Sequence, residues 1–402
     1  MMGRRRNKRR KKEKLMNVDW AELPQSILEI IFERLPLIDC ISVSDVCRAW
    51  SNVIGQELSC WQRRGVPWLM MCGQKDRHVR TCLSILQNQD WEMVLHQAIG
   101  RYCWGSYQDW LILVKDVDCF NLEISLLNPF SGKKTDLPKT WNFYHKMVLS
   151  ALPSVENFVC MLVHGQHREL AFWVHGAQSW LKHKLDGEPF EDAVFSDGSF
   201  YLLSSDYNIS QIKVTDVLAA IRTDDDCEIE TGCHEVKMSE EQEDEQESYT
   251  VLKYLVESCG ELLLVCRFYS TKPNAILETR DFKVYKLDFS QMAWKRVHDL
   301  GDQVLFLGKC CSRSVSSGEL GVPMTNRIYF SNDHAAPWWN EWDSSHLYGI
   351  PARFDPDRRD WGVFKLGDDN QENFRFRGNT DCWAPIWFTA PQWWCCRNLA
   401  LR

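Results

Sequence analysis

The chain has 402 residues, of which 45% are hydrophobic and 25% are charged, with 19 tryptophans and a formal net charge of −8. This composition is typical of a soluble globular protein with room for two or three domains, and no apolar run reaches the roughly 18 residues of a membrane-spanning helix. The 17 cysteines are scattered and never spaced as C-x-x-C. That pattern argues against a zinc site and indicates reduced thiols in the cytosol or the nucleus.

Residues 1–17 are predicted to be a basic, disordered tail. Nine of the first 14 residues are Lys or Arg and one is acidic, so the rest of the chain carries a net charge of −16. The tail could be a nuclear localisation signal, a nucleic-acid-binding arm or a solvated extension. Because the acidic remainder would repel phosphates and no aromatic residues interleave the charges, we favour the nuclear signal and consider a nucleic-acid partner disfavoured. The predicted signal comprises Arg4, Arg5, Arg6, Lys8, Arg9, Arg10, Lys11 and Lys12.

Residues 18–60 are predicted to form two or three short helices. Pro24 is placed near a helix start, apolar residues follow at spacings of three and four, and Leu35-Pro36 ends the first helix. The apolar side chains of residues 27–35 cover an arc of roughly 200°, whereas about 100° is enough to face one core. The simpler interpretation is a helical hairpin packed on the next domain. The wide arc instead favours a second surface that docks a partner.

Residues 61–100 are predicted to be a helical or irregular linker, and residues 101–396 a mostly β domain. Short runs of β-branched, aromatic and leucine residues alternate there with Gly, Asp, Asn and Pro turn signals. The stretches 285–302 and 352–368 each place a Trp six residues after an Asp and end in Leu-Gly-Asp. Such repeats favour a β-propeller over a sandwich, with the tryptophans in the core between blades, and leave the number of blades open.

An acidic stretch at residues 223–248 interrupts the β pattern. It contains TDDDCEIE and SEEQEDEQES, and it lacks both periodicity and aromatic residues. We therefore predict a solvated, disordered loop, which could be an interaction segment but is better explained as a flexible insertion.

The helical segment resembles the F-box, a short module by which substrate receptors dock onto the Skp-type adaptor of cullin-based ubiquitin ligases. The resemblance rests on Leu23-Pro24, the spaced aliphatic residues, Leu35-Pro36 and the VCRAW stretch at residues 46–50. It implies a partner for the surplus apolar surface, because one side of an F-box packs on its own chain and the other fits the adaptor. Carried over by position, the adaptor-binding residues are Leu23, Pro24, Ile27, Leu28, Ile31, Val46 and Trp50.

The C-terminal part resembles the F-box-associated β-propeller of a large plant group, the kink-suppressor type. The matching segments occur in the family's order: LLNPFSG at 126–132, DAVFSDGSFYLL at 192–203, LGDQVLFLG at 300–308, NRIYFSND at 326–333 and WAPIWFTAP at 383–391. The fold class is therefore expected to be α+β and multidomain, a short helical F-box followed by a mostly β, propeller-like domain.

The two resemblances imply a non-catalytic substrate receptor of an SCF-type ligase. Its partners would be a Skp-type adaptor, a cullin reached through that adaptor, and an unknown target held by the propeller. No catalytic motif, metal site or cofactor site is predicted from the sequence, and no membrane partner. Two alternatives stay open: a nuclear scaffold without ligase function, and a propeller enzyme or small-ligand binder with a site in the central channel.

Overall fold

The chain divides into two compact units, Met1–Arg63 with Gln392–Arg402, and Arg64–Pro391. The computed structural model describes residues 23–32, 47–48, 50, 53, 66–71, 78–85, 89–118, 121–140, 144–164, 168–223, 229–238, 249–270, 279–320, 324–331, 360–367, 370–373 and 385–390. The first unit contains the helix α1 (Gln25–Phe32).

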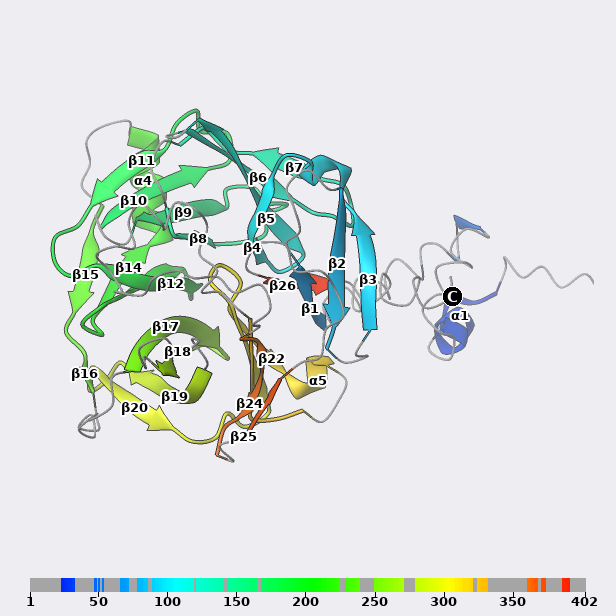
Figure 1. The fold of residues 1–402 in the computed structure, drawn as a ribbon. Helices are drawn as coiled ribbons and strands as arrows, with labels where there is room; N and C mark the ends of the chain where they lie inside the picture. Colours follow the sequence, from blue (N-terminus) through cyan, green and yellow to red (C-terminus); the bar gives the residue numbers. More distant parts are fainter. Residues whose placement is uncertain are drawn as a thin grey trace, which may run out of the picture. The chain divides into compact units, whose positions relative to one another are not determined.

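The second unit is a six-bladed β-propeller, in which six sheets surround a common axis (Figure 1). Each sheet is one blade, numbered here in chain order. Blade 1 contains β1 (Val66–Met71), β2 (Val79–Ser84), β3 (Gln89–Val94) and β26 (Ile386–Ala390). Blade 2 contains β4 (Tyr102–Tyr107), β5 (Trp110–Asp118), β6 (Asn121–Leu127) and β7 (Lys134–Asp136). Blade 3 contains β8 (Lys146–Leu149), β9 (Val159–His164), β10 (Glu169–Val174) and β11 (Leu181–Lys184).

The other three blades follow in the same order along the chain. Blade 4 contains β12 (Phe190–Ser196), β13 (Ser199–Ser204), β14 (Ile209–Lys213) and β15 (Thr231–His234), with helix α4 (Val214–Thr223) after β14. Blade 5 contains β17 (Tyr249–Ser258), β18 (Glu261–Ser270), β19 (Thr279–Asp288), β20 (Ala293–Val297) and β16 (Lys237–Met238). Blade 6 contains β21 (Gln303–Leu307), β22 (Arg313–Ser316), β23 (Arg327–Phe330), β24 (Gly362–Lys365) and β25 (Asn370–Asn373), with helix α5 (Ser317–Leu320) after β22.

The two ends of the propeller sequence meet in blade 1, and this pairing closes the ring. Strand β26 pairs with β1 in antiparallel register, with Trp68 opposite Phe388 and Met70 opposite Ile386. The linker predicted for residues 61–100 is therefore wrong where β1, β2 and β3 lie. These strands have few turn signals between them, and the partner that completes their sheet comes from the other end of the domain.

Two hairpins show how the local sequence produces the blades. Ser196 pairs with Ser199 across a two-residue turn in which Asp197 and Gly198 have φ values of 42° and 74°. Positive φ at both positions is the turn geometry that matches the twist of paired strands, and Asp-Gly adopts it at low cost. The NPFSG segment works differently, because Asn128 Oδ1 accepts hydrogen bonds from the backbone N–H groups of the second and third residues after it, at 3.0 and 2.8 Å. These turns are the signals from which strands were predicted.

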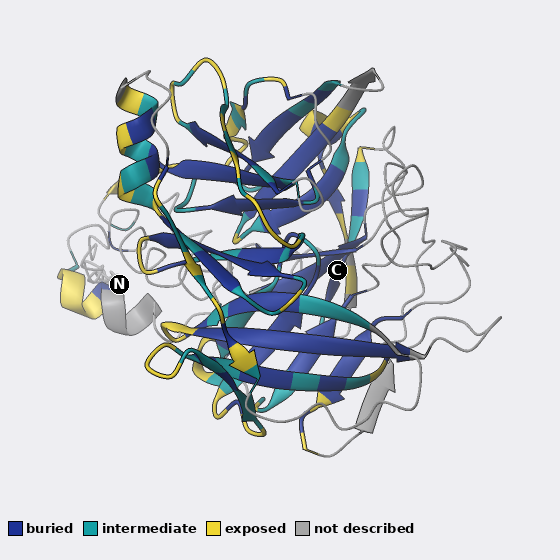
Figure 2. Cartoon of the chain, turned by 90° about the vertical axis from the view of Figure 1, so that its left-hand side faces the viewer, coloured by how far each residue is buried: buried dark blue, intermediate teal, exposed yellow. Residues whose placement is uncertain are grey.

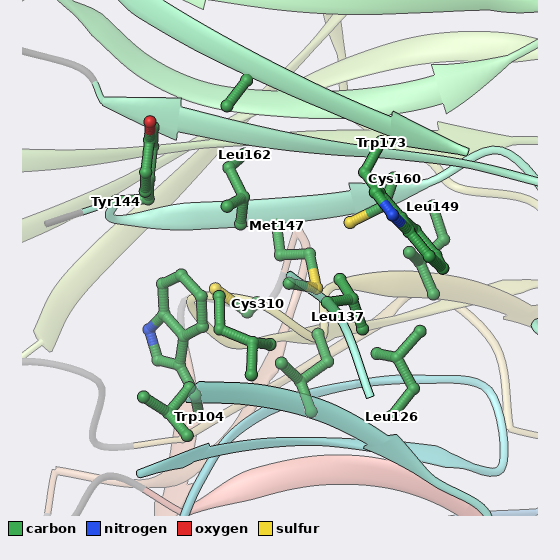
Figure 3. Packing of buried hydrophobic residues seen from close by; sticks show 14 of the residues in the cluster. Trp104, Leu126, Leu137, Tyr144, Met147, Leu149, Cys160, Leu162, Trp173 and Cys310 are labelled. Carbon is green, nitrogen blue, oxygen red and sulfur yellow. The ribbon is translucent and has the colours of Figure 1, made fainter. Parts of the chain in front are cut away.

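Buried side chains fill the spaces between neighbouring blades. Burial is concentrated in the strands, and exposed positions gather at turns and edges (Figure 2). Between blades 2 and 3, Trp104 and Leu126 face Met147 and Leu162, and Cys310 lies beside Trp104 (Figure 3). The repeat tryptophans Trp294 and Trp361 are 0% and 3% exposed, which confirms their prediction as core residues.

The turn between β21 and β22 reaches from blade 6 to the inner strands of three other blades. The N–H of Ser106 in blade 2 donates to Cys310 O at 3.1 Å, and Lys146 Nζ in blade 3 donates to Lys309 O at 2.9 Å. In blade 1, the N–H of Trp387 donates to Cys311 Sγ at 3.3 Å. We call residues 308–312 the axial turn, because these contacts place it across the centre of the ring.

Replacing Gly105 with alanine tests the fit of the axial turn. A Cβ atom at Gly105 would lie 2.4 Å from Cys310 Cβ and 2.7 Å from Cys310 O, so either β4 or the turn must shift. We expect the free energy of unfolding in urea to fall by about 1–3 kcal/mol, as for other overpacked cores. Gly318→Ala is the control, since its nearest neighbour, Ser316 Oγ, is 3.8 Å away. Equal stability of the two variants would contradict this packing.

Candidate functional site

The predicted adaptor-binding segment begins at helix α1, whose first turn is set by Pro24. The carbonyl oxygen of Pro24 accepts hydrogen bonds from the N–H groups of Ile27 at 2.9 Å and Leu28 at 3.2 Å. Proline suits this position because its fixed φ is compatible with a helix start and its missing N–H would have no partner inside the helix. The prediction that Pro24 stands near a helix start is confirmed.

The residues predicted to bind the adaptor divide by exposure. Pro24 is exposed, the Ile27 side chain is 43% exposed, and Leu23 and Trp50 are half-buried. Leu28 is 1% exposed and follows Ile27 by one position, so it turns to another face of the helix, and its role in docking stays a prediction. An exposed isoleucine beside an exposed proline is apolar surface that the described part of the chain leaves open to a partner.

Three predictions fall wholly or largely outside the described residues. The structure describes Ile31 only as part of the α1 backbone, and it does not describe Val46. The eight basic residues between Arg4 and Lys12 also lie outside the described part, and their role as a nuclear signal stays a prediction.

The acidic stretch 223–248 is partly a folded element, which corrects its prediction as a disordered loop. Strand β15 pairs with β14, and β16 runs parallel to β20. Ile229 and Val236 are 5% and 8% exposed, so two isolated apolar residues anchor the segment to blades 4 and 5. Residues 224–228 and 239–248 lie outside the description. These strands were not predicted because charged residues dominate the stretch. Both strands are also short and lie at the outer edges of their blades.

A buried ion pair lies next to the axial turn. Lys146 Nζ is 2.5 Å from Asp192 Oδ1, which joins blades 3 and 4, and the two side chains are 7% and 5% exposed. Asp192 also accepts hydrogen bonds from the N–H groups of Ala193 and Leu255, both at 2.8 Å. Burial lowers the pKa of Lys146, but the charge of Asp192 outweighs it, so that pKa lies above its ordinary value. No sequence pattern predicts this pair.

His145 gives the centre of the propeller a pH dependence. Burial, together with the charges of Lys309 and Lys146, lowers the pKa of His145 to about 3. Above about pH 6.5, the pKa of an unfolded histidine, His145 is neutral in both the folded and the unfolded state. Between about pH 6.5 and 3 only the unfolded state binds the proton, so the folded state loses stability as the pH falls. We expect the free energy of unfolding to decrease between those values by up to about 1.4 kcal/mol per pH unit from this residue alone. Urea titrations across the range should show a shallower decrease for His145→Gln, and identical slopes would contradict the assignment.

A second buried cation, Arg267 on β18, joins blades 5 and 6. Its side chain is 0% exposed. Nη2 pairs with Asp360 Oδ2 at 2.9 Å, Nη1 donates to Ser331 O at 2.9 Å, and Nε donates to Thr279 Oγ1 at 2.8 Å. Asp360 also accepts hydrogen bonds from the Thr279 backbone and hydroxyl at 3.2 and 2.8 Å. We call these four residues the Arg267 cluster.

The Arg267 cluster holds two chain connections together. Ser331 follows β23 and Asp360 precedes β24, while Thr279 begins β19 after the connection from β18. The guanidinium is also covered by aromatic rings, with Cζ 4.5 Å from the Phe330 centroid and 4.9 Å from that of Tyr269. One buried cation therefore holds together described residues that flank both connections. Its sequence signal is a single arginine inside the apolar run ELLLVCRFY.

Neither a metal-binding cluster nor a membrane-spanning helix is found in the described part of the chain. No group of three or more His, Cys, Asp or Glu side chains among them could hold a metal ion. None of the described helices is long and apolar enough to cross a membrane.

Comparisons with known proteins agree with both resemblances. A family model described as KIB1-4 beta-propeller matches residues 83–365, and one described as F-box-like matches residues 20–66. The F-box protein At2g26160 of Arabidopsis thaliana is 22% identical over 354 residues, 78% of this chain and 95% of its own length. The F-box/kelch-repeat protein At1g57790 of the same plant is 22% identical over 324 residues, 77% and 82% of the two chains. This chain is an F-box protein that belongs to the KIB1-4 beta-propeller family.

Proposed function

We propose that this protein is the substrate-recognition subunit of an SCF-type ubiquitin ligase. Its F-box-like segment would dock a Skp-type adaptor, and the propeller would hold a target protein. The observation that carries the proposal is the coincidence of the F-box-like match with a helix that exposes Ile27 beside Pro24. A cullin would be reached through the adaptor.

The chemistry required of such a receptor is proximity. Ubiquitin passes from a charged conjugating enzyme to a lysine of the target, and the receptor raises the effective concentration of that lysine by holding both in one assembly. No catalytic group of the receptor is needed. A rigid propeller suits this role because its blades are joined by buried pairs such as Lys146 with Asp192 and Arg267 with Asp360.

The axial turn supports a receptor over a propeller enzyme. An enzyme of this fold would place its reacting groups in the central channel, where they could meet a small substrate. Here Cys310 and Lys309 contact the inner strands of blades 2 and 3 across the axis. The protein's own backbone therefore crosses the centre of the ring at the level of this turn.

Assembly of the ligase core tests the proposal. The full-length chain is co-expressed with a Skp-type adaptor and the adaptor-binding region of a cullin, and the mixture is analysed by size-exclusion chromatography with light scattering. We expect one complex that contains all three chains. Elution of a folded receptor apart from an intact adaptor–cullin complex would overturn the proposal and favour a scaffold without ligase function.

A further inference from the structure

Blade 2 carries a row of charged side chains where its inner strand β4 begins. Tyr102 pairs with Val114, which places Arg101 and Lys115 at the same level on neighbouring strands. Lys115 is directly opposite Glu123 on β6. Lys139 lies in the connection from β7 to β8, next to the bridge between Leu122 and Thr140. The sheet register therefore brings three cations around one carboxylate.

The cations of this row outnumber the carboxylate with which they pair. Glu123 Oε2 lies 3.6 Å from Arg101 Nη2 and 3.7 Å from Lys115 Nζ, while Oε1 lies 3.4 Å from Lys139 Nζ. All three distances are longer than a good charged hydrogen bond, which measures about 2.7–2.9 Å. One carboxylate is shared among three cations and satisfies none of them closely.

Two further observations point to an excess of positive charge. Arg101 Nη1 is buried and has no hydrogen-bond partner in the described part of the chain, although a guanidinium has donors for several acceptors. The neighbouring carboxylate, Asp136, is held by Lys134 at 2.7 Å, so it adds no net negative charge. Lys115 and Lys139 keep 46% and 63% of their side chains exposed. This surface is cationic on a body whose net charge outside the first 14 residues is −16.

We propose that Arg101, Lys115 and Lys139 form an anion-recognition site that accepts a carboxylate or phosphate from an acidic segment of the target protein. Arginine and lysine beside one another are the groups that bind such anions, and an incoming anion would take the positions that Glu123 fills incompletely. The proposal rests on the proposed function, since it names the chemistry of the segment that the receptor would hold.

An acidic protein segment fits the site better than a nucleic acid does. A nucleic acid presents a continuous row of phosphates and needs an extended cationic surface without large acidic neighbours. Here the three cations gather at one end of one blade, on a body whose net charge outside the first 14 residues is −16. A short group of carboxylates or phosphates matches the size of the site.

The experiment measures binding of defined anionic probes to the full-length chain by fluorescence anisotropy at low ionic strength. The probes are a fluorescein-labelled glutamate-rich peptide, the same sequence with phosphoserine in place of glutamate, a serine-only peptide and a short single-stranded DNA. We expect both anionic peptides to bind and their affinity to fall as salt is added. The serine-only peptide should not bind. The ratio of the affinities for the glutamate-rich and phosphoserine peptides shows whether the site prefers carboxylate or phosphate.

Three variants with opposite expected signs connect the binding to this row. Lys115→Ala and Lys139→Ala each remove one exposed cation and should lower the affinity for the anionic peptides by about twofold to fivefold. Glu123→Gln removes the carboxylate that competes with the peptides for the three cations, and it should raise the affinity by a similar factor. Lys182→Ala in blade 3 and Lys295→Ala in blade 5 are matched controls, because these lysines are 42% and 44% exposed and each pairs with a carboxylate of its own blade. The controls should leave the affinity unchanged.

The results separate this inference from the proposed function. Failure of both anionic peptides to bind a chain that still binds the Skp-type adaptor overturns the inference alone. DNA binding equal to that of the peptides, or equal effects of the Lys182 and Lys115 variants, also overturns it. Peptide binding with the expected variant pattern supports the site even if the adaptor does not bind, in which case the ligase proposal fails instead.

Discussion

Ile27→Glu is expected to lower the affinity of the full-length chain for a Skp-type adaptor by at least about thirtyfold. The side chain is 43% exposed in the free chain and lies one turn from Pro24, so docking would bury it against the adaptor. Residues that carry an interface cost about 2 kcal/mol or more on truncation, and a buried unpaired carboxylate adds a further penalty. Because Ile27 is exposed before docking, the free chain should keep its stability.

Two neighbours in the same helix are the controls for that result. Ser26→Ala changes an exposed polar residue and should leave both affinity and stability nearly unchanged. Leu28→Ala removes a side chain that is 1% exposed, so it should destabilise the N-terminal unit by about 2–5 kcal/mol. Adaptor titrations combined with circular dichroism distinguish the two effects. Unchanged affinity in Ile27→Glu would show that this face of α1 does not dock.

Arg267→Leu is expected to destabilise the propeller by about 3–5 kcal/mol, among the largest effects of any single substitution. The change leaves Asp360, which is 9% exposed, without its cation, and removing one partner of a buried ion pair typically costs that amount. It also removes the donor to the Ser331 carbonyl. Urea unfolding of the full-length chain, followed by tryptophan fluorescence, measures the loss.

The double variant Arg267→Leu with Asp360→Leu isolates the cause. If the uncompensated carboxylate produces most of the effect, the double variant should be more stable than Arg267→Leu alone. The exposed pair of Lys286 with Glu261 is the reference: its atoms are 2.7 Å apart, yet Lys286→Ala should cost less than about 1 kcal/mol. Equal losses in the buried and exposed pairs would contradict the importance assigned to the Arg267 cluster.

The fold class and the strands that flank clear turn signals could be predicted because those signals are local. Asp197-Gly198 determines a tight turn, and the Asp-to-Trp spacing of the repeats places Trp294 in the core. The number of blades could not be predicted, since it depends on which sheet the first and last strands complete. Residues of β1 and β26 pair although they lie at opposite ends of the domain, and no local pattern announces that partner.

The candidate sites were predicted only in part, for a related reason. The spacing of apolar residues in α1 predicted a docking surface but did not separate the exposed Ile27 from the buried Leu28, because the wide arc included both. Lys146 and Asp192 lie in two separate strands, and sequence cannot tell that the propeller brings them within 2.5 Å of each other. The three cations around Glu123 likewise come from three separate segments, so their proximity depends on sheet register.

Isothermal titration of the folded, full-length chain with a purified Skp-type adaptor decides whether the protein is an F-box receptor in function as well as in family. A known F-box receptor serves as the positive control, and Ile27→Glu as the matched negative. We predict saturable binding of one adaptor per chain, weakened at least about thirtyfold in the variant. Absence of binding to the wild-type chain, under conditions in which the control receptor binds, would contradict the assignment of the N-terminal helix as an adaptor-docking element.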